Sequence, residues 1–240
     1  ALEETNADID AAIDWLRTQG LAKAAKKSSR VAAEGLVAVA TSDGKGVAVE
    51  VNSETDFVAK NSDFHDMGKA IATAALDVSN TDELASASID GKTVADTLTD
   101  NIAKIGENMT LRRMQTIEAE RVVTYVHNSA TQDMGQIGVL VAINGDNTEF
   151  ARHVAMHVAA ANPQALSAAE LDQSIVEREK NILTEQARES GKPEQVIEKM
   201  IQGRMKKFLA EVTLLGQDFV INPDLTVEAA EYKGRKVKLN

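Results

Sequence analysis

The chain has 240 residues, of which 43% are hydrophobic and only 3% aromatic, and its formal net charge is −11 at pH 7. This length allows one or two domains with real cores, and the acidic balance opposes non-specific binding to nucleic acid, which needs a cationic surface. The chain contains no cysteine, which excludes disulfides and thiolate chemistry, and no apolar run approaches the roughly 18 residues of a membrane span. We therefore expect a cytoplasmic protein without a membrane partner.

Residues 1–27 predict a partial N-terminal helical module. Asn6–Asp8 offers a helix N-cap, and Gly20 is typical of a helix end. Apolar residues recur at helical spacing, namely Ile9, Ile13 and Leu16. Since this stripe lacks a partner helix in the sequence, we expect part of the module to precede Ala1.

The segment Lys23–Arg30 carries four cations and no acid. One interpretation is a solvated helix end followed by a linker over 28–34. The other is a contact with an acidic partner, and together with Lys206-Lys207 it leaves open an RNA-binding or scaffold function. Such a function predicts a steep salt dependence of RNA affinity.

A β-hairpin and a helix open a core N-subdomain, which we expect over 35–121. Strands at Leu36–Thr41 and Gly46–Asn52 flank Ser42–Lys45, whose glycine suits a tight turn. Asp63 then begins a helix with one apolar face, formed by Phe64, Met67, Ile71, Ala74 and Val78.

The following polar residues predict a short helix, a turn and a second helix that ends near Ile105. A core C-subdomain begins at 122–166 and contains a helix over Asn147–Ala161. The strands that we expect in this part of the chain are Asn108–Ile117, Val122–Tyr125 and Ile137–Asn144, with a loop at Asn128–Gly135.

A strand followed by a helix occurs twice in the chain. Gly46–Asn52 resembles Gly138–Asn144, and a phenylalanine opens the helix after each. From strand end to phenylalanine is 12 positions in the first copy (52 to 64) and 6 in the second (144 to 150), so the first holds an insertion of 6 residues. The pattern suggests two related subdomains rather than a solenoid, and a true duplication stays open.

The inserted piece is Thr55-Asp56-Phe57-Val58-Ala59-Lys60-Asn61. In one interpretation it is an ordinary helix entry in which Ser53 or Thr55 is the cap and Phe57 folds inward. In the other, Phe57 is an exposed wedge that enters a partner's pocket, where full burial is worth about 1.5–3 kcal/mol.

Residues 167–210 predict two helices joined by a turn at Gly191–Pro193. Helices of this length form an antiparallel hairpin about 27–30 Å long. The first arm is rich in glutamate and the second in cations, which favours pairing of the arms. The hairpin is interpreted either as a self-association or partner device, or as simple packing on the body.

Residues 211–240 predict a return to the core C-subdomain and a truncated C-terminal segment. We expect strands at Val212–Leu214 and Phe219–Ile221 and a turn at Asn222–Asp224.

No enzyme chemistry is indicated. Glu149, His153 and His157 share a helical face, but the order of the zinc peptidases is absent, and core or interface histidines are the better interpretation. There is also no phosphate loop, dinucleotide fingerprint or nucleophile elbow. We therefore expect no catalytic residue, no metal and no cofactor.

The motif at Thr55–Asn61 after a valine-rich strand closely resembles the signature of the elongation factor Ts family. Further blocks resemble the family in the same order, namely 24–27, 31–35, 104–108, 137–141, 153–160 and 203–208. The resemblance implies an α+β fold with a small N-terminal helical module, two core subdomains and a protruding coiled-coil hairpin. The family's segment before Ala1 and its continuation at Tyr232–Asn240 are not matched.

The resemblance also implies a guanine-nucleotide exchange factor that acts on elongation factor Tu, in its GDP-bound and nucleotide-free forms. Asp56 and Phe57, flanked by Thr55 and Val58, would enter the GTPase domain of that partner and displace the elements that hold its Mg²⁺. Met156 and His157 would form a second contact. A nucleic-acid partner is not expected.

Overall fold

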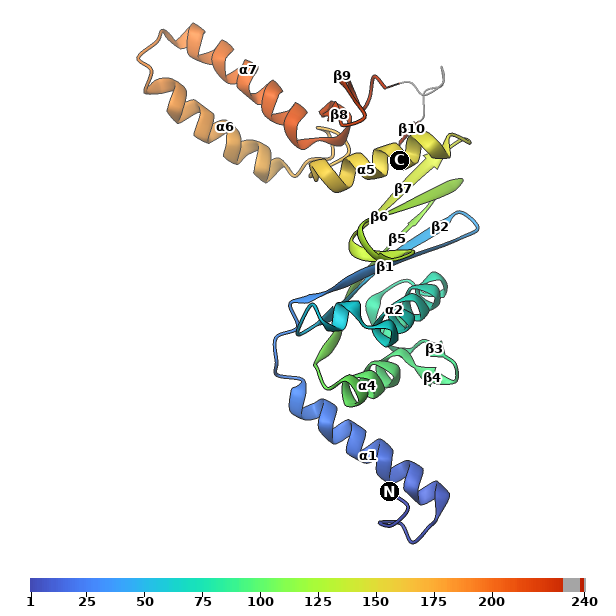
Figure 1. Cartoon of the computed structure of the whole chain (residues 1–240). Helices are drawn as coiled ribbons and strands as arrows, with labels where there is room; N and C mark the ends of the chain where they lie inside the picture. Colours follow the sequence, from blue (N-terminus) through green and yellow to red (C-terminus); the bar gives the residue numbers. More distant parts are fainter. Residues whose placement is uncertain (231–237, 240) are drawn as a thin grey trace. The chain divides into compact units, whose positions relative to one another are not determined.

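The computed structural model describes residues 1–230 and 238–239, in two compact units, Ala1–Asp146 and Asn147–Asn240. Both contain helices and antiparallel strands, so the α+β class is confirmed (Figure 1). The predicted subdomain boundaries at 121/122 and 166/167 stay predictions. Within the described residues, no helix has both the length and the apolar character that crossing a membrane requires.

The first unit is built on an antiparallel sheet with the strand order β5-β2-β1-β7-β6. The strands are β1 (Glu34–Ser42), β2 (Lys45–Ser53), β5 (Met109–Glu118), β6 (Arg121–Thr131) and β7 (Met134–Asn144). The predicted hairpin is confirmed, with Ser42 paired to Lys45 and Glu34 to Ser53. Its two turn residues, Asp43 and Gly44, both have positive φ, as the tightest hairpin turns require.

Four helices accompany this sheet. They are α1 (Ile9–Lys27), α2 (Ser62–Ala74), α3 (Thr81–Ser86) and α4 (Val94–Ile105), with a small hairpin of β3 (Ser88–Ile89) and β4 (Lys92–Thr93) and 3-10 turns η1 (Val58–Lys60) and η2 (Ala75–Asp77). The apolar face predicted for α2 packs against β1 and β2 and supplies the core residues Phe64, Met67 and Ile71. The helix α4 ends as predicted at Ile105, because Gly106 adopts φ 92° and caps it, as glycine does readily.

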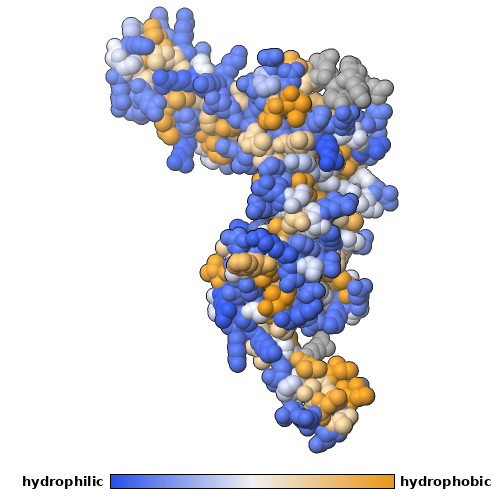
Figure 2. Space-filling model, in the orientation of Figure 1, coloured by the Kyte–Doolittle hydropathy of each residue, from blue (hydrophilic) through white to orange (hydrophobic). Residues whose placement is uncertain are grey.

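The N-terminal helix differs from its prediction at one end. It does not stop at Gly20 but continues to Lys27. The helices α1 and α4 pack against each other at this point, where a Cβ at Gly20 would meet Ala103 Cβ at an ordinary contact distance of 3.6 Å. Gly20 therefore lies within the α1–α4 contact and is not a helix end. The apolar stripe near the N-terminus is exposed (Figure 2), with Ile9, Ile13 and Leu16 each more than half accessible.

The loop predicted at Asn128–Gly135 is wrong. The strand β6 continues to Thr131 and β7 begins at Met134, so the connection is a tight turn at Gln132-Asp133. The polar residues of this segment still pair with β7, as Ser129 does with Gly135. Asn128 takes a positive φ, and the register shifts between Ser129 and Thr131. A β-bulge of this kind lets loop-like residues stay in a paired ribbon.

The second unit contains α5 (Thr148–Ala161) and the predicted helical hairpin. Its arms are α6 (Gln173–Arg188) and α7 (Glu194–Val212), which run side by side (Figure 1) and bury Leu183, Ala187 and Ile197. The remaining elements are the 3-10 turn η3 (Leu214–Gly216) and the short strands β8 (Asp218–Phe219), β9 (Asn222–Thr226) and β10 (Lys238–Leu239).

Three local predictions in this unit are wrong. Val212–Leu214 is not a strand, because α7 continues to Val212 and η3 follows, although Thr213 forms a single bridge to Ala165. The strand at Phe219–Ile221 ends at Phe219, and Asn222–Asp224 is strand rather than turn. Phe219 pairs with Asn222, so the apolar pair between them occupies the turn, and the usual polar turn signals pointed two residues too late.

Candidate functional site

The candidate site lies in the connection between β2 and α2. This connection has eight residues, 54–61, whereas only three, 145–147, join β7 to α5. The longer first connection is therefore confirmed. It ends at Asn61, whose side chain accepts a hydrogen bond from Asp63 N at 2.8 Å and so caps α2. Asparagine is among the preferred residues for this role.

Phe57 faces solvent at the outer edge of this connection. Its side chain is 76% exposed, while Val58 and Ala59, which follow it in η1, are 5% and 8% exposed. The interpretation in which Phe57 folds inward is wrong. The other four phenylalanines of the chain are buried or half-buried. A largely exposed aromatic ring next to buried neighbours gives up most of a burial that is worth about 1.5–3 kcal/mol when complete, which makes Phe57 a candidate for a partner contact.

Asp56 and Lys60 complete a small surface group around this ring, which we call the Asp56–Phe57–Lys60 cluster. Lys60 Nζ donates to Asp56 Oδ2 at 2.7 Å and lies 5.6 Å from the centroid of the Phe57 ring. The hydrogen bond from Lys60, and then its positive charge, lower the pKa of the Asp56 carboxyl below its ordinary value. Asp56 is therefore a carboxylate at neutral pH, within reach of an incoming partner. The sequence motif includes Lys60, but its pairing with Asp56 was not predicted.

We expect Lys60→Met to raise the pKa of Asp56 toward the value of an unpaired aspartate, because the two largest lowering influences come from the ammonium group of Lys60. Carbon-detected NMR titration of the Asp56 carboxyl in the two proteins measures this. Lys69→Met, a lysine bonded to Thr131 instead, is the control and should leave the Asp56 titration unchanged. An identical titration curve in Lys60→Met would contradict the pairing.

The base of the cluster is attached to the residues that follow α4. Thr55 donates its backbone N–H to Glu107 Oε2 at 3.0 Å and its hydroxyl to Glu107 Oε1 at 2.8 Å. In return, Glu54 Oε1 accepts the backbone N–H of Asn108 at 2.6 Å. No local sequence pattern predicts these bonds, since the partners are 52 and 54 positions apart.

The second predicted contact, on α5, has a different character. His157 is fully buried and lies 5.8 Å, ring to ring, from Phe219. Val220 N donates to its Nδ1 at 3.2 Å, so Nε2 carries the proton that Gln217 Oε1 accepts at 2.9 Å. Both ring nitrogens are thus occupied within the second unit. This burial speaks against the expectation that His157 itself touches a partner, whereas Met156 beside it is half-buried and keeps part of its surface accessible.

No group of three or more His, Asp or Glu side chains within residues 1–230 and 238–239 is arranged to hold a metal ion. His157 in particular has no free nitrogen for one.

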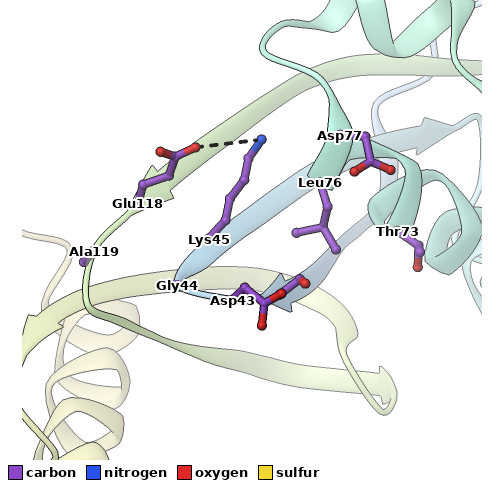
Figure 3. Close-up of a pocket in the computed structure, with 9 residues that line it drawn as sticks. Asp43, Gly44, Lys45, Thr73, Leu76, Asp77, Glu118 and Ala119 are labelled. Carbon is purple, nitrogen blue, oxygen red and sulfur yellow. Dashed lines mark ion pairs between the residues drawn. The ribbon is translucent and has the colours of Figure 1, made fainter.

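An open pocket of about 590 Å³ lies at the other end of β2, against the β1–β2 turn. Figure 3 shows Lys45 reaching toward Glu118, with Asp43 and Asp77 on the facing sides. The Lys45–Glu118 pair is loose at 4.0 Å, and Lys45 also donates to the carbonyl of Val78 at 3.3 Å. This mixture of charges contains no recognisable catalytic arrangement.

Comparison with known proteins shows which family this chain resembles. Residues 54–238 match the family described as Elongation factor TS, a match that begins at the connection carrying the cluster. Relatives named Elongation factor Ts include that of Ruegeria sp. (strain TM1040), 67% identical over 96% of this chain and 79% of the relative. Those of Ruegeria pomeroyi and Paracoccus denitrificans are 66% identical over 96% and 79%, and 62% identical over 99% and 82%, respectively.

Proposed function

Because this chain belongs to the elongation factor Ts family, we propose that it binds elongation factor Tu and promotes the release of GDP from it. Nucleotide exchange on elongation factor Tu during translation elongation is the activity of this family. The protein then acts as an exchange factor on a GTPase, not as an enzyme with its own catalytic residues.

The exposure of Phe57 carries the proposal. The ring stands out beside the Asp56 carboxylate, on a backbone that is anchored on both sides by Thr55 and by the buried Val58. Inserted into the GTPase domain, the ring and the carboxylate displace the elements that hold Mg²⁺. That ion demands near-ideal octahedral coordination and is among the largest local charges at the nucleotide phosphates. When Mg²⁺ loses its ligands, the binding of GDP to elongation factor Tu is therefore weakened.

Linkage sets the direction of the exchange reaction. If the factor binds nucleotide-free elongation factor Tu more tightly than the GDP-bound form, then GDP must lower the affinity of elongation factor Tu for the factor by the same ratio. No covalent step is needed, and GTP releases the factor in the same way.

The second contact is assigned to Met156 on α5. Its side chain is half-buried and keeps part of its surface accessible, while His157 is enclosed by Gln217 and Phe219. In this proposal His157 fixes the position of α5 from inside, and Met156 supplies the surface. Self-association through the α6–α7 hairpin stays a prediction, and we propose no nucleic-acid or membrane partner.

The function is tested by capture of purified elongation factor Tu on the immobilised protein. We expect strong retention of the nucleotide-free partner and release on addition of GDP in the presence of Mg²⁺, because GDP and the factor oppose each other. Retention that is indifferent to GDP, or no retention, would contradict the proposal. Steeply salt-dependent binding of RNA would instead support the alternative that uses Lys23–Arg30 and Lys206-Lys207.

A further inference from the structure

Two short segments far apart in the sequence hold each other through reciprocal hydrogen bonds. The Glu107 carboxylate accepts the backbone N–H of Thr55, and the Glu54 carboxylate accepts the backbone N–H of Asn108. We call this four-residue arrangement the reciprocal clamp. Hydrogen bonds to an ionised acceptor are about twice as strong as neutral ones, so the clamp is a stiff connection.

Further bonds surround the clamp. Glu107 takes a second bond from the Thr55 hydroxyl, and the Asn108 side chain donates to the carbonyl of Arg30 at 2.8 Å. Arg30 in turn lies 3.5 Å from the second oxygen of Glu54, whose side chain is only 18% exposed. Each carboxylate therefore binds one backbone N–H and one side-chain group.

The clamp ends where the proposed wedge begins. Thr55, which gives both its donors to Glu107, directly precedes Asp56 and Phe57. On the other side, Val58 and Ala59 are buried and Asn61 caps α2. The two residues in between are thus held at both ends, although their own side chains face solvent.

We propose that Glu107, supported by Glu54, is a positioning residue for nucleotide exchange: it holds Asp56 and Phe57 ready to enter the partner. The inference rests on the function proposed above. An exposed loop that is fixed before binding does not have to be ordered during binding, and this lowers the entropic cost of association. A misplacement of about 1 Å can reduce the rate of a positioned step by as much as about 10²-fold.

The test is a double-mutant cycle between Glu107→Ala and Phe57→Ala, read as stimulated release of a fluorescent GDP from elongation factor Tu at sub-saturating factor. We expect Glu107→Ala alone to slow release about tenfold. In the Phe57→Ala background it should change the rate less than about twofold, because residues that act through one another are not additive. An equal loss in both backgrounds, or no loss in the first, would overturn the assignment.

Glu83→Ala is the matched control. Glu83 also accepts a backbone N–H, from Ser79 at 2.9 Å, and a side-chain donor, from Asn80 at 2.8 Å, but it does so beside α3. We expect a comparable loss of local bonding with unchanged exchange. Glu107→Gln, which keeps one accepting oxygen, and Thr55→Val, which keeps the backbone donor, should give intermediate rates and serve if Glu107→Ala does not fold.

Hydrogen exchange of the free protein separates the clamp from the wedge. The Thr55 amide should exchange faster in Glu107→Ala, since its acceptor is gone, while the amides of β1 and β2 stay protected. Unchanged Thr55 protection would overturn the clamp even if the wedge is correct. If the Thr55 amide exchanged its hydrogen faster in Glu107→Ala but Phe57→Ala stimulated GDP release as well as the native protein, the clamp would stand and the wedge would be wrong.

Discussion

Phe57→Ala is expected to slow the GDP release that this protein stimulates from elongation factor Tu by about 30-fold, and Asp56→Ala combined with it by more. Truncating a central aromatic anchor of an interface removes about 2 kcal/mol or more of binding energy, and each 1.4 kcal/mol is a factor of ten. The fold should not suffer, because Phe57 is 76% exposed in the free protein and substitutions at such positions change stability by about 0.5 kcal/mol or less.

Release of a fluorescent GDP is measured over a range of factor concentrations, with thermal unfolding as the check of the fold. Ile137→Ala is the matched control, since Ile137 is an exposed apolar side chain on β7. Phe57→Leu keeps much of the apolar volume and should fall between the native protein and Phe57→Ala. An unchanged rate at saturating Phe57→Ala would eliminate the wedge mechanism.

The site shows how far local sequence patterns reach. Spacing between the two strand–helix units predicted the extra residues before α2, and the hairpin that precedes them was predicted almost to its ends. The direction in which Phe57 points was not predictable in this way. A cap followed by apolar residues suits either orientation, and the outcome depends on Val58 and Ala59 occupying the interior in its place.

Contacts between distant segments account for most of what the sequence did not reveal. Glu107 and Thr55 are 52 positions apart, so no periodicity connects them, although both lie in blocks that resemble the family. The helical stop assigned to Gly20 failed for a similar reason, because α4 packs against α1 at that point. Turn chemistry also failed where two apolar residues, Val220 and Ile221, form the turn between β8 and β9.

His157 is a further example, since the family resemblance named it together with Met156 without showing which of the two side chains is buried. We expect His157→Ala to lower the free energy of unfolding of the second unit by about 2–4 kcal/mol. The ring leaves a cavity beside Phe219, and truncating large buried side chains costs about 2–5 kcal/mol. Gln217 and the N–H of Val220 also lose their partners, at about 1–3 kcal/mol for each buried group left unsatisfied.

Urea unfolding monitored by circular dichroism measures this loss, with Met156→Ala as the neighbouring control that should change stability by less than about 1 kcal/mol. GDP-release assays on the two variants then distinguish a residue that positions α5 from a residue that contacts the partner. Met156→Ala should slow GDP release while leaving stability nearly unchanged, and His157→Ala should affect release only as far as α5 is displaced. If His157→Ala were as stable as the native protein and slow in exchange, the histidine would have to leave its buried site and touch the partner directly. The two hydrogen bonds that hold both ring nitrogens argue against that movement.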